Sequence, residues 1–285
     1  MPYSTTTIDE FSVGYDFQKE WVERRGLLIA MAFYLGEAGT GLFLGSLLVG
    51  WKLGLIIGIG IVAIGDGGCH LLYLGRPLRF WRAFWRPQSS WISRGMFILV
   101  LFIIFGLAYY FVGSTALLGI TVFLALCVML YVGFAMAFSA SMPFWNNALL
   151  PVMFIGTGLA SGMSLLLTIY SFAPQTLSDT AILDLMGPVL AIILVILIGV
   201  YMWTNYFSSI AARESVKFLG TGRFSSIFYS AVVLLGLVIP LAILIPAYFG
   251  SVPLALLSVA GICALLGSFA LRYSLLKAGI YPPIV

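Results

Sequence analysis

Residues 66–95 read DGGCHLLYLGRPLRFWRAFWRPQSSWISRG, and they join the end of one long apolar segment to the start of the next. Asp66 and His70, the only histidine of the chain, lie inside the first apolar segment. Arginines and tryptophans then alternate up to the second segment, which begins near Ile92: Arg76, Arg79, Arg82, Arg86, Arg94, Trp81, Trp85 and Trp91. Ionisable groups inside hydrocarbon beside a basic, Trp-rich boundary are typical of a reaction site at a membrane surface. A charged loop next to a kinked helix would have the same composition.

The composition of the whole chain indicates a membrane protein. Of its 285 residues, 62% are hydrophobic and 8% are charged, and the mean hydropathy is +1.11. Soluble domains carry about 25% charged residues. The apolar runs extend over about twenty residues without alternation, which favours transmembrane helices over the strands of a barrel. We therefore expect an all-α integral membrane protein.

Eight apolar segments are long enough to span a membrane. Their approximate limits are 26–50, 53–75, 92–113, 115–138, 148–171, 184–208, 226–250 and 253–276. Very short links after the first, third and seventh spans predict antiparallel neighbours, and we expect two four-helix bundles within one domain over 26–280. Pairs of glycines four residues apart, such as Gly41/Gly45 and Gly158/Gly162, permit close helix approach.

The first 25 residues are polar and are expected to form a cytoplasmic tail. Within it, Phe17 to Arg25 could form a short helix at the membrane interface, with Trp21 as its anchor. In the seventh span, Pro240 and Pro246 predict a kink.

Lysine and arginine fall almost entirely on one side of an eight-span topology. Three lie in the N-terminal tail, five in the loop after the second span, three after the sixth span and two at the C-terminal end, which makes 13 of the 14 in the chain. Only Lys52 lies on the other side. Because loops rich in Lys and Arg stay in the cytoplasm, we expect both termini to be cytoplasmic, in the inner membrane of a bacterium or archaeon. The net charge of +4 then reflects this topology and contact with membrane lipid, with no nucleic acid as a partner.

Five polar side chains lie inside the spans within reach of the basic side. Glu37 is about 11 residues into the first span, roughly 16 Å deep at 1.5 Å per residue. Asp66 and His70 lie roughly 13 and 8 Å deep by the same rise, and their i, i+4 spacing puts them on one helix face. Tyr34 and Tyr131 complete the group. Carboxylate, imidazole and phenol groups on one side can bind a polar head group and transfer protons, so Glu37, Asp66, His70 and Tyr131 are candidate catalytic residues.

Structural explanations for these residues stay open. Asp66 could pair with His70 or cap an irregular turn, and His70 could hydrogen-bond a carbonyl near the interface. Tyr131 could be a packed or interfacial aromatic residue. Glu37 is the hardest to explain in this way, because nothing in its own helix neutralises it and an ionised carboxylate at a helix centre costs about 2.5–3.5 kcal/mol. Arg272, near the end of the last span, is expected to extend its guanidinium to the membrane surface.

Metal and haem ligands are scarce in this chain. Its cysteines, Cys69, Cys127 and Cys263, are far apart in apolar segments, and it has a single histidine. An iron–sulfur cluster, a zinc site or a bis-histidine haem cannot be built from these residues alone. We therefore expect no metal or haem bound by this chain, and each cysteine acts as a small buried hydrophobic side chain.

Several segments resemble, in order, motifs of the NrfD/polysulfide reductase membrane-subunit family. They are YLGEAGTG at 34–41, LGRPLRFW at 74–81 with SWISRG at 90–95, LYVGFAMAF at 130–138, and PFWNNALLPVMFIGTGLASG at 143–162. The resemblance covers essentially residues 26–280. Family members often read Asp-Leu-Gly-Arg-Pro, whereas this chain has Tyr73 before Leu74, and its acid lies at Asp66 instead.

The resemblance implies an eight-helix quinone-reactive subunit of a membrane oxidoreductase, with quinone or menaquinone as its substrate-like cofactor. Electrons would pass between the quinone and a ferredoxin-like iron–sulfur subunit, which commonly serves a molybdenum or tungsten catalytic subunit. Tyr131, Asp66 and the polar positions of the first span, Tyr34 and Glu37, map to the quinone pocket, and Arg76 and Arg79 map to the boundary near it.

In this interpretation each polar residue has an expected role. Tyr131 and His70 hydrogen-bond the quinone oxygens, while Asp66 and Glu37 exchange protons. The two boundary arginines stabilise negative charge or hold the partner subunit.

Two other classes of function stay open. A proton or small-solute translocator would need polar residues across the whole membrane, but the half away from the basic loops offers only Asp179 and Asp184, near its edge. A passive membrane anchor of a redox enzyme would account for the basic loops but leaves Glu37 and Asp66 without a role.

Overall fold

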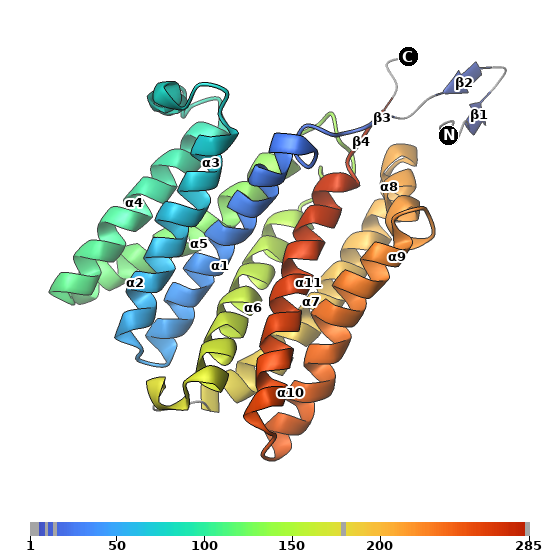
Figure 1. Ribbon diagram of the computed structural model, residues 1–285. Coiled ribbons are helices and arrows are strands. Elements are labelled where there is room, and N and C mark those ends of the chain that lie inside the picture. The colour runs from blue at the N-terminus through green and yellow to red at the C-terminus, as the bar shows by residue number, and fades with distance from the viewer. Residues whose placement is uncertain (1–5, 9–10, 14–15, 178–180, 283–285) are drawn as a thin grey trace.

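The computed structural model describes residues 6–8, 11–13, 16–177 and 181–282, and in them eight helical spans long and apolar enough to cross a membrane lie side by side (Figure 1). Six of these spans are single helices, and five of the six are α1 (Leu27–Leu48), α4 (Trp91–Val112), α5 (Thr115–Ala137), α6 (Leu149–Phe172) and α11 (Leu254–Lys277). The sixth span is α7 (Ala181–Ser208), which contains Pro188. The expected all-α membrane fold is confirmed, and the largest boundary difference is the start of the sixth span at Ala181 rather than 184.

Two spans contain π-helical stretches. The second consists of α2 (Lys52–Gly60), the π-helical η2 (Ile61–Asp66) and α3 (Gly67–Tyr73). The seventh consists of α9 (Ser225–Ile227), the π-helical η5 (Phe228–Val238) and α10 (Ile239–Phe249). The seventh span is thus π-helical up to Val238, two residues before Pro240, which cannot donate a backbone hydrogen bond, while the kink expected at Pro240 and Pro246 stays a prediction.

The largest helix–helix contact in the described chain joins α1 and α6. Their backbones meet where Gly41 of α1 faces Gly158 and Gly162 of α6: an added Cβ at Gly41 would collide with the Gly158 backbone, and one at Gly162 with the Gly41 backbone. The glycine spacing therefore serves close packing, as its pattern predicts. Because α1 and α6 would belong to different bundles, the division into two four-helix bundles stays a prediction.

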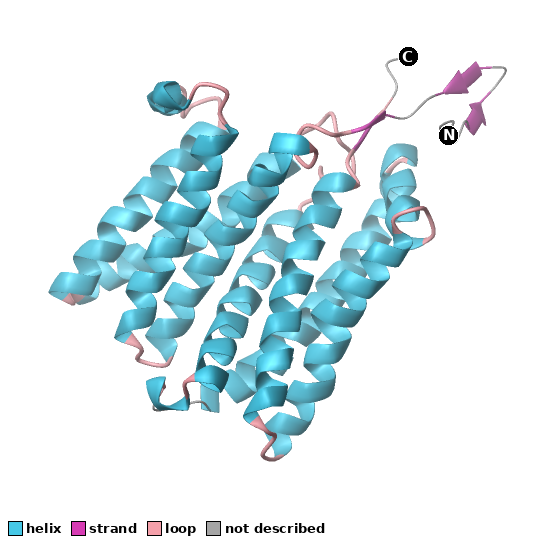
Figure 2. Cartoon of the chain, viewed as in Figure 1, coloured by secondary structure: helices cyan, strands magenta, loops and turns pink. Residues whose placement is uncertain are grey.

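The two ends of the described chain pair on the same face of the molecule (Figure 2). Strand β3 (Asp16–Phe17) is antiparallel to β4 (Ile280–Tyr281), and the Gln18 amide donates to the Leu276 carbonyl. Strands β1 (Thr6–Ile8) and β2 (Phe11–Val13) form a separate antiparallel pair.

The prediction of an interfacial helix from Phe17 to Arg25 is wrong. The backbone at the start of this segment pairs with the C-terminal strand β4 instead. Between β3 and α1, the helical structure of the described chain is the single 3-10 turn η1 (Arg24–Gly26). Trp21 packs against Trp145 and Phe33 of the protein rather than serving as an isolated membrane anchor.

Three short helical segments lie outside the spans. They are the 3-10 segments η3 (Pro77–Phe84) and η4 (Pro174–Thr176), and the helix α8 (Ile210–Gly220). The sequence predicts a loop, not a helix, where α8 lies. Ser209 caps this helix by accepting a hydrogen bond of 3.1 Å from Ala212 N.

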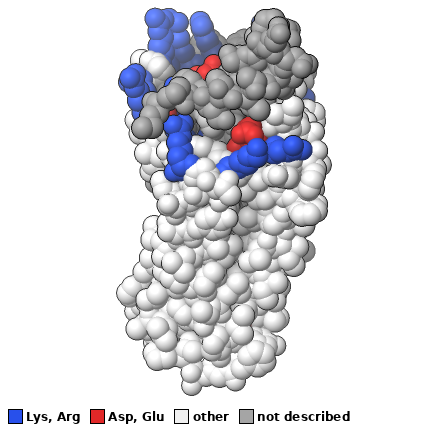
Figure 3. Space-filling view, turned by 90° about the vertical axis from the view of Figure 1, so that its right-hand side faces the viewer, with Lys and Arg blue, Asp and Glu red and all other residues white. Residues whose placement is uncertain are grey.

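Charge is concentrated at one end of the molecule. On the side seen in Figure 3, lysine, arginine and acidic residues lie near the end that carries the paired termini, and the opposite end is free of them. Lys52 begins α2 and Asp184 lies in the first turn of α7, both away from that basic end. Asp179 lies outside the described residues. The described part thus has the charge asymmetry that the sequence predicts.

Candidate functional site

Asp66 and His70 face each other at the junction between η2 and α3. His70 Nδ1 lies 2.6 Å from Asp66 Oδ1, and the same nitrogen lies 3.1 Å from the Asp66 backbone oxygen. Asp66 is 1% exposed, whereas the His70 side chain is 21% exposed. The i, i+4 spacing therefore produces the ion-pair geometry that was one of the open alternatives for Asp66. The wider π-helical turn ends at Asp66, and such turns are frequent at functional sites.

A cavity of about 190 Å³ lies beside this pair. His70 and Tyr131 line it together with mostly apolar side chains from four elements and the N-terminal segment: Trp21, Ile29, Phe33, Leu71, Leu74, Phe80, Ile92, Met96 and Leu99. Tyr131 is 6% exposed, so its phenol belongs to the interior of the bundle and not to an interfacial aromatic belt. The structure thus brings two of the four candidate catalytic residues to one cavity, with Asp66 directly behind His70.

Gly95 sets the position of the Tyr131 ring. A Cβ at Gly95 would overlap that ring. We expect Gly95→Ala to displace Tyr131 and to destabilise the chain by about 1–3 kcal/mol, the usual cost of overpacking. Equilibrium unfolding of the purified chain in mixed micelles measures this. Gly68→Ala is the matched control, because nothing lies within 4 Å of a Cβ built there; equal stability of the two variants would contradict the assignment.

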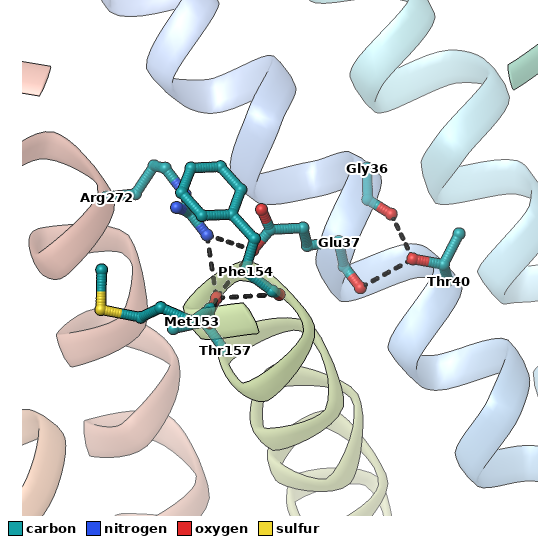
Figure 4. A network of polar contacts seen from close by, with 7 residues as sticks. All are labelled: Gly36, Glu37, Thr40, Met153, Phe154, Thr157 and Arg272. Atoms are coloured by element: carbon teal, nitrogen blue, oxygen red, sulfur yellow. Dashed lines mark hydrogen bonds and ion pairs between the residues drawn. The ribbon is translucent and has the colours of Figure 1, made fainter. Parts of the chain in front are cut away.

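A second polar cluster joins three helices next to the first (Figure 4). Arg272 of α11 forms an ion pair with Glu37 of α1. The Thr157 hydroxyl of α6 accepts from Arg272 Nη2 at 2.9 Å and lies 2.9 Å from Glu37 Oε2, to which it donates. The guanidinium lies 3.4 Å from the centroid of the Phe154 ring, a cation–π contact.

This cluster is closed to solvent. Glu37, Arg272 and Thr157 are 2%, 1% and 2% exposed. Glu37 Oε1 and the Nε and Nη1 atoms of Arg272 make no hydrogen bond within the described residues. The pair is therefore a buried charge pair whose partial hydrogen bonding makes each partner dependent on the other.

The expectation that Arg272 extends to the membrane surface is wrong. Its guanidinium points into the protein because its ion-pair partner Glu37 lies inside the helix bundle, and neither charge is stable alone in hydrocarbon. The sequence does hold a signal for this pairing: Glu37 and Arg272 are the charged residues placed inside the first and last spans. Each lacks a partner of opposite charge in its own span, and their depths in the membrane are compatible, so the sequence alone could have suggested that they pair.

Asp66 connects the two clusters. A Cβ at Gly36, the residue before Glu37, would collide with the Asp66 carboxylate, so this side chain packs directly on the α1 backbone. The glycine at position 36 thus permits a carboxylate of the second span to lie against α1, next in sequence to Glu37.

Tyr34, expected in the pocket, and Arg76 and Arg79, expected at its boundary, do not line this cavity. The Tyr34 hydroxyl donates to the Leu265 carbonyl of α11 at 3.1 Å, and Tyr34 does not line the cavity. Arg76 and Arg79 are exposed at and within η3, whose Phe80 and Ala83 reach the cavity in their place. Among the described residues, no three His, Cys, Asp or Glu side chains gather as a metal site.

A comparison with protein-family models assigns the chain. The model described as polysulphide reductase, NrfD, matches residues 113–283, more than half of the chain. A comparison with curated proteins found no match. The matched part includes Tyr131, Thr157 and Arg272, while Glu37, Asp66 and His70 precede it. The cavity and the buried ion pair are thus each built partly from the matched spans of a chain that belongs to the polysulphide reductase NrfD family.

Proposed function

We propose that this chain is the quinone-reactive membrane subunit of an oxidoreductase complex, in which it exchanges electrons between a membrane quinone and an iron–sulfur partner subunit. One observation carries the proposal. An apolar cavity at the basic end of the bundle holds the His70 imidazole, backed by Asp66, together with the Tyr131 phenol. The NrfD family is associated with membrane subunits of quinone-linked oxidoreductases, which supports the same reading.

The cavity is suited to the ring of a quinone. Its volume of about 190 Å³ is below the 300–1,000 Å³ of sites that enclose a whole drug-sized ligand, so the isoprenoid tail would stay in lipid. Aromatic and aliphatic side chains supply the walls, and two hydrogen-bonding side chains supply orientation. A bound quinone contributes two-electron, two-proton redox chemistry that this chain's residues do not have themselves.

The side chains have separate tasks in this proposal. Asp66 holds His70 through Nδ1, which leaves Nε2 to hydrogen-bond one quinone oxygen and to exchange a proton with it. The Tyr131 hydroxyl, from α5, hydrogen-bonds a quinone oxygen as well. Asp66 balances positive charge on His70. Glu37, fixed by Arg272, keeps a second carboxylate next to Asp66 and is the candidate for further proton exchange.

The basic end is the proposed docking side for the partner. The one-sided distribution of Lys and Arg favours a cytoplasmic location for this end and for both termini, in a bacterial or archaeal inner membrane. The exposed Arg76 and Arg79 lie just before η3 and within it, near Phe80 and Ala83 of the cavity wall in the sequence, and would hold a ferredoxin-like iron–sulfur subunit there. A molybdenum or tungsten subunit would complete the complex.

The test is quinone binding to the assembled complex in lipid nanodiscs. We expect Tyr131→Phe and His70→Leu each to weaken the binding of a menaquinone analogue about tenfold, equal to about 1.4 kcal/mol, because each removes one hydrogen bond to the ring. Tyr34→Phe is the matched control, since it removes a phenol hydroxyl that bonds Leu265 and not the cavity. Unchanged affinity in both cavity variants would overturn the site; weakening by Tyr34→Phe alone would move it to α11.

A further inference from the structure

The opposite end of the bundle has a second cavity, of about 320 Å³. It lies where the turn between α1 and α2 meets the end of α4, far along the same helices from the quinone site. Ser46, Trp51, Lys52, Tyr109 and Tyr110 line it. Gly50 and Gly113, whose φ angles are +67° and +71°, end the two helices in the left-handed conformation and so form its edge.

Lys52 gives this cavity its charge. It is the single Lys or Arg that the topology leaves at this end, whereas the other 13 are expected at the basic end. Its ammonium lies 5.1 Å from the centroid of the ring of Tyr110, which also lines the cavity. The cavity lining contains no carboxylate, and within the described residues Lys52 forms no ion pair. The cation is therefore available to an anion from outside the chain.

Ser46 supplies an unused hydrogen-bond donor. It is 1% exposed, yet its Oγ has no hydrogen-bond partner among the described residues. Serines inside helices ordinarily bond the carbonyl four residues back, as Ser164 and Ser274 do here. Ser46 lines the cavity instead, next to Gly54, where a Cβ would collide with its hydroxyl. Buried polar groups normally have a partner, and this hydroxyl, packed beside Gly54 of α2, has none among the described residues.

The start of α2 points to the same kind of ligand. This helix begins at Lys52 and continues through the membrane to Tyr73, and no side chain caps its first turn. Free backbone N–H groups and the helix dipole at such an end favour an anion. A cation, a buried hydroxyl and an uncapped helix start therefore meet at one cavity.

We propose that this cavity binds a phosphate group, and that its natural source is the headgroup of an anionic phospholipid in the leaflet opposite the basic end. Trp51, Tyr109 and Tyr110 support the lipid source, because aromatic side chains of this kind gather at the level of lipid headgroups. The proposal is independent of the quinone site, which lies at the other end of the bundle.

Native mass spectrometry of the delipidated full-length chain, titrated with phosphatidylglycerol, tests the proposal. We expect one high-affinity lipid whose dissociation constant rises about tenfold in Lys52→Gln and several-fold in Ser46→Ala. Lys217→Gln is the matched control, because Lys217 lies at the basic end in an exposed pair with Glu214 and should leave binding unchanged. Quinone binding should be unchanged in all three variants, which also shows that they fold.

Two further ligands separate the possible sources. Diacylglycerol, which lacks phosphate, should not occupy the site. Displacement of the lipid by millimolar inorganic phosphate in the wild type, but not in Lys52→Gln, would keep the phosphate site and make free phosphate its ligand. Equal binding of phosphatidylglycerol by the wild type and Lys52→Gln, or equally tight binding of diacylglycerol, would overturn the proposal.

Discussion

Arg272→Met is expected to lower the free energy of unfolding by about 3–5 kcal/mol, the cost of leaving one member of a buried ion pair without its partner. The charge of Glu37 would then lie in a closed layer with only Thr157 as a hydrogen-bond donor. The free energy of inserting a lone charged side chain at the centre of a membrane helix is about 2.5–3.5 kcal/mol, which independently gives a similar cost. Equilibrium unfolding in mixed micelles measures the change.

A double-mutant cycle separates the pair from the rest of α11. Glu37→Leu combined with Arg272→Met should recover most of the lost stability, because replacing both charges with apolar groups is often neutral. Lys217→Met is the control, since its exposed pair with Glu214 is worth at most about 1 kcal/mol. An effect of Arg272→Met no larger than that of Lys217→Met would contradict the buried pair.

The spans could be predicted from the sequence because the membrane imposes one rule on each of them separately. Each must hold about twenty apolar residues, so a segment such as 92–113 is recognised without knowing its neighbours, and α4 occupies Trp91–Val112. The same holds for local geometry: Asp66 and His70 meet because they are four residues apart on one helix.

Contacts between distant segments could not be predicted in this way. Glu37 and Arg272 are separated by 235 residues, and only the packing of α1 against α11 brings them together. The β3–β4 pair likewise replaces the helix that the polarity of 17–25 favours, because its partner lies at the other end of the chain. Tyr34 shows the converse: its depth suited the pocket, but its direction around α1 turns it towards Leu265.

Gly162→Leu is expected to disrupt the contact between α1 and α6. A Cβ at Gly162 would collide with the backbone of Gly41, and backbone cannot move aside as a flexible side chain does. Overpacking costs about 1–3 kcal/mol and occasionally more, and we expect a loss of at least about 3 kcal/mol here. Gly199→Leu is the matched control: nothing lies within 4 Å of a Cβ there, and leucine is a better helix former than glycine by up to about 1 kcal/mol.

The same substitution should also weaken the ion pair, because Gly41 lies one helical turn from Glu37 on α1 and Gly162 lies five residues after Thr157 on α6. Separating the two helices breaks the 2.9 Å contact between the Thr157 hydroxyl and Glu37. In the variant that combines Gly162→Leu with Arg272→Met, the total loss of stability should therefore be smaller than the sum of the two single losses. Strict additivity would mean that the glycine crossing and the buried charges are independent, and that the close approach of α1 and α6 does not position Glu37.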